Sequence, residues 1–407
     1  MKLDAIQTVA FAGAVLFAGY GVRRLVPPLA RYNIPAPVIG GLIVAGILTF
    51  ARSRGSVPLE FDTLLQAPMM VAFFTTIGFA ASIRLLRTGG PQVLLFFALA
   101  TVVAVAQNVL GAGLAWGMGL HPLFGVLTGS VTLTGGPATG LAFAPLFEAA
   151  GVPGAEAVAV TAAMVGIVMG GVIGAPIGTR LVERHGLRVR RTHPVETPPP
   201  TQAMEDQLAD PPTATPAGED AEAFVLLKSI VLILVAMWGG SWVSAGFTAL
   251  GVTLPGYIGA MLVAAVIRNV DDVTGRIGLS QRIIDDVGNV ALALFISMAL
   301  MTLKLWQITD LALPMLVILV AQVLLVAVIA YGPIFALMGR DYEATVMSGG
   351  FCGFMLGTTA NAMANMRSLA ERYGQAPRAF LVVPMVGAFF IDFTNAIIVT
   401  GFVNVLK

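Results

Sequence analysis

The sequence predicts an all-α polytopic membrane protein built from two inverted repeats of five helices each. Composition is the first reason. Of 407 residues, 57% are hydrophobic and only 11% are charged, whereas soluble domains carry about 25% charged residues. The mean hydropathy of +0.87 means that polar side chains cannot cover a soluble fold of this length, so the chain requires a bilayer. The other two reasons are a series of long apolar runs and a pair of broken apolar segments, one in each half.

Ten apolar runs, separated by charged residues, Pro and Gly, are predicted to span the membrane. In the first half they cover about 5–24, 36–51, 67–86, 93–119 and 157–183. In the second half they cover about 223–248, 254–268, 288–304, 312–338 and 379–404. The first run ends in Arg23 and Arg24 and lacks a basic cluster before it. This pattern favours a retained span with a basic anchor over a cleaved signal peptide.

Residues 188–221 separate the two halves and differ from them in composition. Pro, Thr, Asp and Glu dominate there, and bulky apolar residues are scarce. Such a segment cannot bury enough surface to offset its ordering entropy. We therefore predict a first repeat at 1–187, a disordered linker at 188–221 and a second repeat at 222–407.

Lys and Arg in the short loops predict the orientation in the membrane. If both termini lie outside, most of the basic residues, including the run Arg188, Arg190 and Arg191, fall on the inner side, as the positive-inside rule requires. Five spans per half then give the halves opposite orientations. The linker is therefore predicted to be cytoplasmic.

Two apolar segments, about 123–148 and 345–369, are interrupted by Gly, Pro and Thr. Each contains a Gly-Gly pair after a hydroxyl residue, and paired interruptions in two halves indicate a transporter binding site. Broken helices offer N–H groups to an anion, although glycines in such a segment can also serve only to permit a tight hairpin. The predicted substrate-binding residues are Thr134, Gly135, Gly136, Thr139, Gly140, Ser348, Gly349, Gly350, Gly353, Thr358, Thr359 and Asn361.

Polar residues within the apolar runs are the candidates for a cation site. Asp392 lies in the last span, and an acid at membrane depth costs about 2.5–3.5 kcal/mol, so it either helps bind a cation or anchors a neighbouring backbone. The predicted sodium-binding residues are Asp392, Asn395, Thr75, Thr76 and Asn365. A membrane Thr can instead bond the carbonyl one turn back. Gln107 and Asn108 are expected to link helices.

Several function classes find no support in the sequence. The net charge of +1 gives no argument for nucleic-acid binding, and the chain contains no phosphate-binding G-x-x-x-x-G-K-[ST] loop. The three His residues lack the spacing of a transition-metal site, and Cys352 has no nearby partner for nucleophilic chemistry. We therefore predict no enzyme. A passive channel is disfavoured because the polar residues cluster near two points instead of lining a continuous path.

The chain resembles the bacterial sodium/glutamate symporter family over nearly all of its length outside the linker. The segments that carry the resemblance are FFTTIGFAASIRLLRTGG (73–90), LTGSVTLTGG (127–136), ALALFISMALMTLKLW (291–306), CGFMLGTT (352–359) and LVVPMVGAFFIDFTNA (381–396). The resemblance implies ten spanning helices, two re-entrant segments, a homodimer and an elevator-like movement. It also implies uptake of glutamate across a bacterial inner (cytoplasmic) membrane, with Na⁺ as the coupling ion and no further cofactor.

This sequence departs from the family pattern in both broken segments. The family motif GGHGTG stands here as Gly135–Gly140 with Pro137 and Ala138, a family His is replaced by Phe351, and a Pro-Thr pair by Ala360 and Asn361. The prediction is therefore a sodium-coupled symporter for glutamate or a similar small carboxylate, in membrane lipid. The alternative is the same fold with proton coupling or with a non-amino-acid organic anion.

Overall fold

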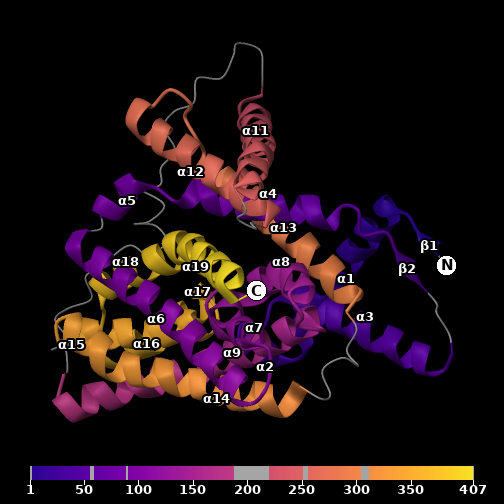
Figure 1. Ribbon diagram of the computed structural model, residues 1–407. Coiled ribbons are helices and arrows are strands. Elements are labelled where there is room, and N and C mark those ends of the chain that lie inside the picture. The colour runs from indigo at the N-terminus through magenta and orange to yellow at the C-terminus, as the bar shows by residue number, and fades with distance from the viewer. Residues whose placement is uncertain are drawn as a thin grey trace.

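The computed structural model describes residues 2–55, 59–88, 90–187, 220–250, 255–303 and 311–406. Apart from its last two residues, the predicted linker at 188–221 lies outside these ranges. The described chain is helical except for one short parallel strand pair, β1 (Lys2–Leu3) and β2 (Glu60–Phe61) (Figure 1). The N-cap Asp4 accepts a hydrogen bond from Gln7 N at 2.8 Å and so begins the first helix directly after β1.

In the described ranges, seven helices are long and apolar enough to cross a membrane. They are α1 (Ala5–Leu25), α3 (Ala36–Ser53), α6 (Gly90–Gly117), α9 (Ala155–His185), α11 (Ala221–Ala249), α13 (Gln281–Met301) and the continuous run α14 (Ala312–Ile329), η3 (Ala330–Ile334) and α15 (Phe335–Leu337). The predicted class, an all-helical polytopic membrane protein, is confirmed. The inverted relation of the two halves and the domain boundaries stay predictions.

The other three predicted spans correspond to shorter or more charged helices. These are α4 (Gln66–Ala80), α12 (Gly256–Thr274) and the series α18 (Pro377–Met385), η4 (Val386–Phe390) and α19 (Ile391–Leu406). The third predicted span, 67–86, is wrong in extent because α4 ends at Ala80 and a separate helix α5 (Ile83–Thr88) follows. The side chain of Asn269 stabilises this interruption, since its Nδ2 donates to Ala81 O at 2.8 Å and its Oδ1 accepts from Ile83 N at 2.8 Å.

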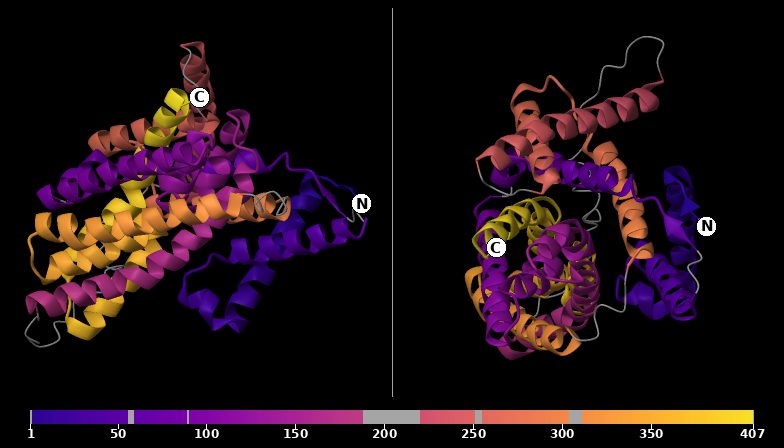
Figure 2. Two further views of the ribbon diagram at one scale, coloured as in Figure 1. Left: turned by 60° about the horizontal axis from the view of Figure 1, so that its bottom comes forward. Right: turned by 45° about the vertical axis from the view of Figure 1, so that its right-hand side comes forward.

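The helices pack as two bundles. The frame bundle comprises α1, α3, α4, α11, α12 and α13, with the short α2 (Pro27–Arg31) between α1 and α3. The core bundle comprises α6, α9, the continuous run α14, η3 and α15, the series α18, η4 and α19, and the two broken segments. In the right-hand view of Figure 2, the core bundle forms a rounded group at the lower left, with the frame bundle above it and to its right. Contacts between the bundles run mainly through α4, α12 and α13 on the frame side and α8, η4 and α19 on the core side.

Both broken segments are helix–break–helix units. The first consists of α7 (Pro122–Val126), the π-helical η1 (Leu127–Val131) and α8 (Gly136–Ala149), with a break at Thr134 and Gly135. The second consists of α16 (Tyr342–Leu356) and α17 (Thr359–Tyr373), with a break at Gly357 and Thr358. Each is held by a close backbone crossing that only glycine permits: Gly125 meets the backbone of Gly111 in α6, and Gly166 of α9 meets the carbonyl of Leu356. That these segments are re-entrant stays a prediction.

Candidate functional site

The two breaks line one cavity of about 620 Å³ between the frame and core bundles. The core side contributes residues 134–138 at the first break and the start of α8, residues 357–360 at the second break and the start of α17, and the start of α19. The frame side contributes the end of α1, the loop before α3, Phe73 of α4, and Asn289 and its neighbours in α13. Segments more than 200 residues apart in sequence therefore meet around one space.

The breaks lie against each other at this cavity. Gly136 has φ +69°, and a Cβ added there would lie 3.9 Å from the carbonyl oxygen of Gly357. The following Pro137 occupies the first turn of α8, where its missing N–H costs no helical hydrogen bond. Gly136 is thus the residue at which the first segment turns from its break into a helix beside the second break.

Both helices that follow the breaks begin at the cavity. No side chain caps α8, which starts at Gly136, and Thr358 caps α17 by accepting from Asn361 N at 3.3 Å. The N-terminus of a helix presents unsatisfied N–H groups and a partial positive charge. Two such ends at one cavity make an arrangement that favours an anion such as a carboxylate.

Two charged side chains also line the cavity, and they come from opposite bundles. Arg23 belongs to the last turn of α1, and Asp392 to the first turn of α19. Within the described parts of the chain, no ion pair involves either of them. The cavity therefore offers a cation and an anion that are not neutralised by a described partner.

A buried polar network supports the first break from behind. Gln107 of α6 accepts from Thr134 Oγ1 at 2.9 Å and donates to Met355 O at 3.1 Å, so one side chain joins both breaks. Beside it, Asn108 Oδ1 accepts from Ser130 N at 3.0 Å. These contacts agree with the expectation that Gln107 and Asn108 link helices.

Asn395 extends this network. Its Nδ2 donates to Ser130 O at 3.0 Å, and its Oδ1 accepts from Ser130 Oγ at 2.6 Å. Asn395 is therefore fully buried behind the first break and does not line the cavity. Its sequence neighbour on the same helical face, Asp392, does line it.

Six of the predicted site residues line the cavity: Thr134, Gly135, Gly136, Thr358, Thr359 and Asp392. Asn361 lies directly beside it, where its Oδ1 accepts from Asn33 Nδ2 at 2.9 Å and its Nδ2 donates to Ile167 O at 2.6 Å. Thr139 and Gly140 are buried inside α8, where Gly140 packs on Ala159.

The second Gly-Gly pair is not at the second break, which corrects the predicted correspondence of the two segments. Gly349 and Gly350 lie inside α16, about two turns before Gly357. They allow α16 to pack on Leu369, Met366 and Val383. The flanking Ser348 and Gly353 are likewise buried in α16 and do not line the cavity.

Three of the predicted sodium ligands have their side chains engaged away from the cavity. Thr75 and Thr76 donate to carbonyls of their own helix, Val71 O and Phe73 O, both at 2.7 Å. Asn365 donates to Gly170 O at 2.9 Å. The alternative interpretation of the two threonines, a bond to the carbonyl one turn back, matches this geometry.

Asn33 and Arg23 are cavity residues that the sequence did not single out as candidates. Asn33 adopts φ +54°, a left-handed conformation that Asn tolerates better than most residues. This conformation places its amide against Asn361, which lies 328 positions later in the sequence. No local signal in the sequence predicts such a pair. Arg23 does have a signal, because it is one of the basic residues that end the first apolar run.

The described residues contain no group of three or more His, Cys, Asp and Glu side chains that could hold a metal ion. The cavity lining includes the carboxylate of Asp392 together with hydroxyl and backbone carbonyl oxygens. These hard oxygen ligands suit an alkali cation more than a transition metal.

Comparison with known proteins gives a consistent result across nearly the whole chain. Residues 1–375 match the family model described as Sodium/glutamate symporter. The sodium/glutamate symporter of Escherichia coli (strain K12) is 39% identical over 401 residues, which cover 98% of this chain and 96% of that protein. The protein of the same name from Haemophilus influenzae is 37% identical over 393 residues, covering 96% and 95%.

One solved structure, a sodium proton antiporter from Methanocaldococcus jannaschii, covers 98% of both chains with 14% identity and a TM-score of 0.41. A likeness at that level carries no weight for fold or function.

Proposed function

This chain belongs to the sodium/glutamate symporter family, and from that premise we propose that it couples the inward movement of Na⁺ to the uptake of glutamate. Membership makes it a multi-pass membrane transporter and not an enzyme. Sodium and glutamate come from the name of the family and its relatives. The cavity between the bundles is the place in this chain where such ligands would bind.

The observation that carries the proposal is the meeting of both breaks at one cavity. The substrate carboxylate would lie at the N-termini of α8 and α17, where Gly135, Gly136, Thr358 and Thr359 line the space. Backbone N–H groups there can donate to it without a cationic side chain. The rest of the substrate would extend toward the frame side of the cavity, which Arg23 and Asn289 line.

We assign the coupling ion to the neighbourhood of Asp392. This carboxylate lines the cavity and lies close in sequence to the buried Asn395, which fixes the first break through Ser130. Sodium bound at Asp392 would neutralise a negative charge that otherwise repels an anionic substrate. Each ligand then improves the binding of the other, and the effect is reciprocal.

The division into two bundles supports alternating access by an elevator-like movement. The core bundle carries both breaks and Asp392, whereas the frame bundle supplies only one wall of the cavity. The core could therefore carry its ligands past the frame as one body. Arg23 lines the cavity at the inner end of α1 in the predicted orientation, so we infer that this structure is the inward-open state in a bacterial inner membrane, with both termini outside.

A homodimer completes the proposal, as the resemblance implies. The frame helix α11 exposes large apolar side chains, among them Trp238 at 62% and Trp242 at 64%. This face is open either to lipid or to a second copy of the chain.

The alternative ligands, a proton or a non-amino-acid organic anion, depend on the residues where this chain departs from the family pattern. Pro137 and Ala360 line the cavity, so these two departures touch the proposed site. Phe351 does not line it and packs edge-on against Phe96 at 5.7 Å and Phe354 at 5.4 Å. The replacement at Phe351 thus bears on packing and the one at Pro137 on the ligand.

Uptake of radiolabelled glutamate into proteoliposomes tests the function. With an inward sodium gradient we expect accumulation that unlabelled glutamate stops, and no accumulation when choline replaces sodium. A folded protein that accumulates nothing under a sodium gradient would contradict the proposal. Counterflow with a panel of organic acids, under sodium or proton gradients, would then identify the alternative ligand.

A further inference from the structure

A second cavity, of about 720 Å³, lies between the bundles at a distance from the breaks. It shares no lining residue with the first cavity. On the frame side it is lined by Val266 and Val270 of α12 together with Ile83 and Leu86 of α5, and on the core side by Phe97 and Phe393 among others. Asn269, Thr274 and Thr394 are its polar lining residues. Apolar side chains predominate in this lining, which therefore suits a hydrocarbon.

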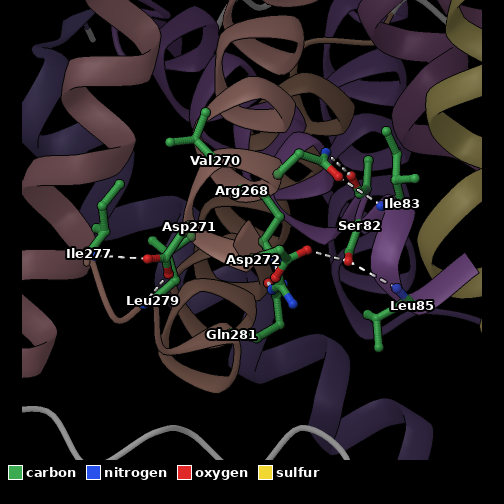
Figure 3. Close-up of polar contacts among 12 residues, drawn as sticks. Ser82, Ile83, Leu85, Arg268, Val270, Asp271, Asp272, Ile277, Leu279 and Gln281 are labelled. Carbon is green, nitrogen blue, oxygen red and sulfur yellow. Dashed lines mark hydrogen bonds and ion pairs between the residues drawn. The ribbon is translucent and has the colours of Figure 1, made fainter. Parts of the chain in front are cut away.

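The frame-side wall of this cavity is held in place by a polar joint between α5 and α12. Figure 3 shows Ser82 and Ile83 facing Asp272 and its neighbours in α12. Ser82 Oγ donates to the Asp272 carboxylate and also accepts from Leu85 N at 3.1 Å. Arg268 Nε in turn donates to Asp272 at 2.9 Å. Ile83 and Leu86 are therefore fixed against α12 instead of closing the space.

The basic residue Arg87 lies next in sequence to the apolar lining of this cavity. Arg87 follows Leu86 in α5 and is exposed, and no described acidic residue forms an ion pair with it. A short helix that turns apolar side chains into a recess and a basic one to the outside resembles the interfacial segments that bind anionic lipid. Each basic residue near such a surface contributes about 1 kcal/mol to that attraction.

We propose that this second cavity binds an acyl chain of an anionic phospholipid whose headgroup lies at Arg87. Several lining residues are open to the surroundings of the protein, for example Val266 at 63% and Val273 at 87% exposure, so a lipid can enter sideways from the bilayer. A fluid chain fills the gap between the bundles without fixing them to each other. The proposal depends on the membrane location of the chain and not on which substrate it carries.

Native mass spectrometry of the purified protein in detergent tests this binding. Phosphatidylglycerol and phosphatidylcholine with the same acyl chains are titrated separately, and the number of lipids retained per chain is measured. Ala265→Phe places a ring into the cavity, and Arg87→Gln removes the charge while leaving the apolar lining intact. The matched controls are Val290→Phe, on an exposed position of α13 that is 62% accessible, and Arg24→Gln, on α1.

We expect the wild-type chain to retain one phosphatidylglycerol at least about tenfold more tightly than phosphatidylcholine, a difference of about 1.4 kcal/mol. Ala265→Phe should remove that lipid, Arg87→Gln should abolish the preference between the two lipids, and both controls should behave as the wild type. Retention unchanged by both Ala265→Phe and Arg87→Gln would overturn the proposal. Equal retention of the two lipids by the wild-type chain would overturn it as well. Arg87→Gln does not alter the apolar lining. If it abolishes the preference for phosphatidylglycerol, that result cannot come from a folding defect such as Ala265→Phe could cause.

Discussion

At the scale of single residues, Asp392 is the acidic group on which the proposed coupling depends. It lines the cavity between the bundles, and no described cation pairs with it. An acid placed at membrane depth without a partner is costly, so a bound cation would compensate it. Removing the charge of Asp392 should therefore weaken sodium binding more than it weakens substrate binding.

Asp392→Asn keeps the shape and one oxygen ligand and removes the charge. We expect the sodium concentration that gives half-maximal uptake to rise by about tenfold, which corresponds to about 1.4 kcal/mol, with a smaller change in the KM for glutamate at saturating sodium. Uptake measured against sodium concentration in proteoliposomes checks this. Glu183→Gln, a surface acid of the same bundle, is the control, and an unchanged sodium dependence in Asp392→Asn would place the cation elsewhere.

Gly136 is the second residue whose role can be tested alone. Its φ of +69° is a backbone conformation that residues with a side chain rarely adopt, although an added Cβ would make only an ordinary contact, 3.9 Å from Gly357 O. Gly136→Ala should strain the break by about 1–2 kcal/mol and raise the KM for substrate while the protein still inserts into the membrane. Gly113→Ala in α6, where no atom lies within 4 Å, should leave the KM unchanged. An equal response of both variants would mean that the break does not form the site.

Residue-scale prediction from sequence succeeded where a residue type is rare in its surroundings. An acid in the last apolar run and a Gly-Gly pair next to Pro137 are visible without a structure, and both proved to line the cavity. The role of Asn33 could not be predicted from the sequence, because it depends on the hydrogen bond to Asn361 across the two bundles. Thr75 and Thr76 were ambiguous, since a hydroxyl in a helix can bond its own backbone, and that is the geometry they adopt.

At the scale of elements, the two breaks are held together by Gln107 of α6. Its side chain accepts from Thr134 in the first segment and donates to Met355 O in the second. The backbone of Gln107 is held as well, because Gln322 Nε2 of α14 donates to Gln107 O at 2.7 Å. The position of the breaks thus depends on a buried amide in a neighbouring helix.

Gln107→Leu approximately preserves the volume of this side chain and removes its amide bonds to Thr134 Oγ1 and Met355 O, so that Thr134 Oγ1 keeps only a 3.9 Å contact with Met355 Sδ. A buried polar group that loses its hydrogen bond costs about 1–3 kcal/mol, so the melting temperature in detergent should fall. Thr101→Val, on the same helix, removes only a bond to its own backbone at Phe97 O and should have little effect. Thermal unfolding followed by light scattering or intrinsic fluorescence measures both, and equal melting temperatures would contradict the bridging role.

The course of the helices was predictable where the apolar run was long, and less so where polar contacts interrupt it. The run at 67–86 reads as one span, yet α4 ends at Ala80 because Asn269 of α12 bonds the backbone on both sides of the interruption. The second predicted tip includes Gly349 and Gly350 as well as Thr358, but the break lies only at Gly357 and Thr358, because a Gly-Gly pair can serve close helix packing as well as a turn. Sequence spacing alone does not distinguish these two uses of glycine.

At the scale of the whole molecule, the frame and core bundles pack against each other around the two cavities. The core carries both breaks, and the contact Asn33–Asn361 is a hydrogen bond that joins the loop before α3 to the start of α17 across this boundary. If the core moves past the frame in each transport cycle, these two residues must separate. If the substrate passes through a fixed core, they stay together.

The measurement that tests this account most directly is transport by a chain in which Asn33→Cys and Asn361→Cys are joined by a short bifunctional thiol reagent. The native Cys352 is buried, and each single variant treated in the same way serves as a control. The account predicts that cross-linking the pair stops the sodium-driven glutamate uptake that the double variant shows before treatment, that cleaving the linker with a reductant restores this uptake, and that the reagent does not change uptake by the single variants. Full uptake by a completely cross-linked chain would contradict the movement of the core bundle against the frame.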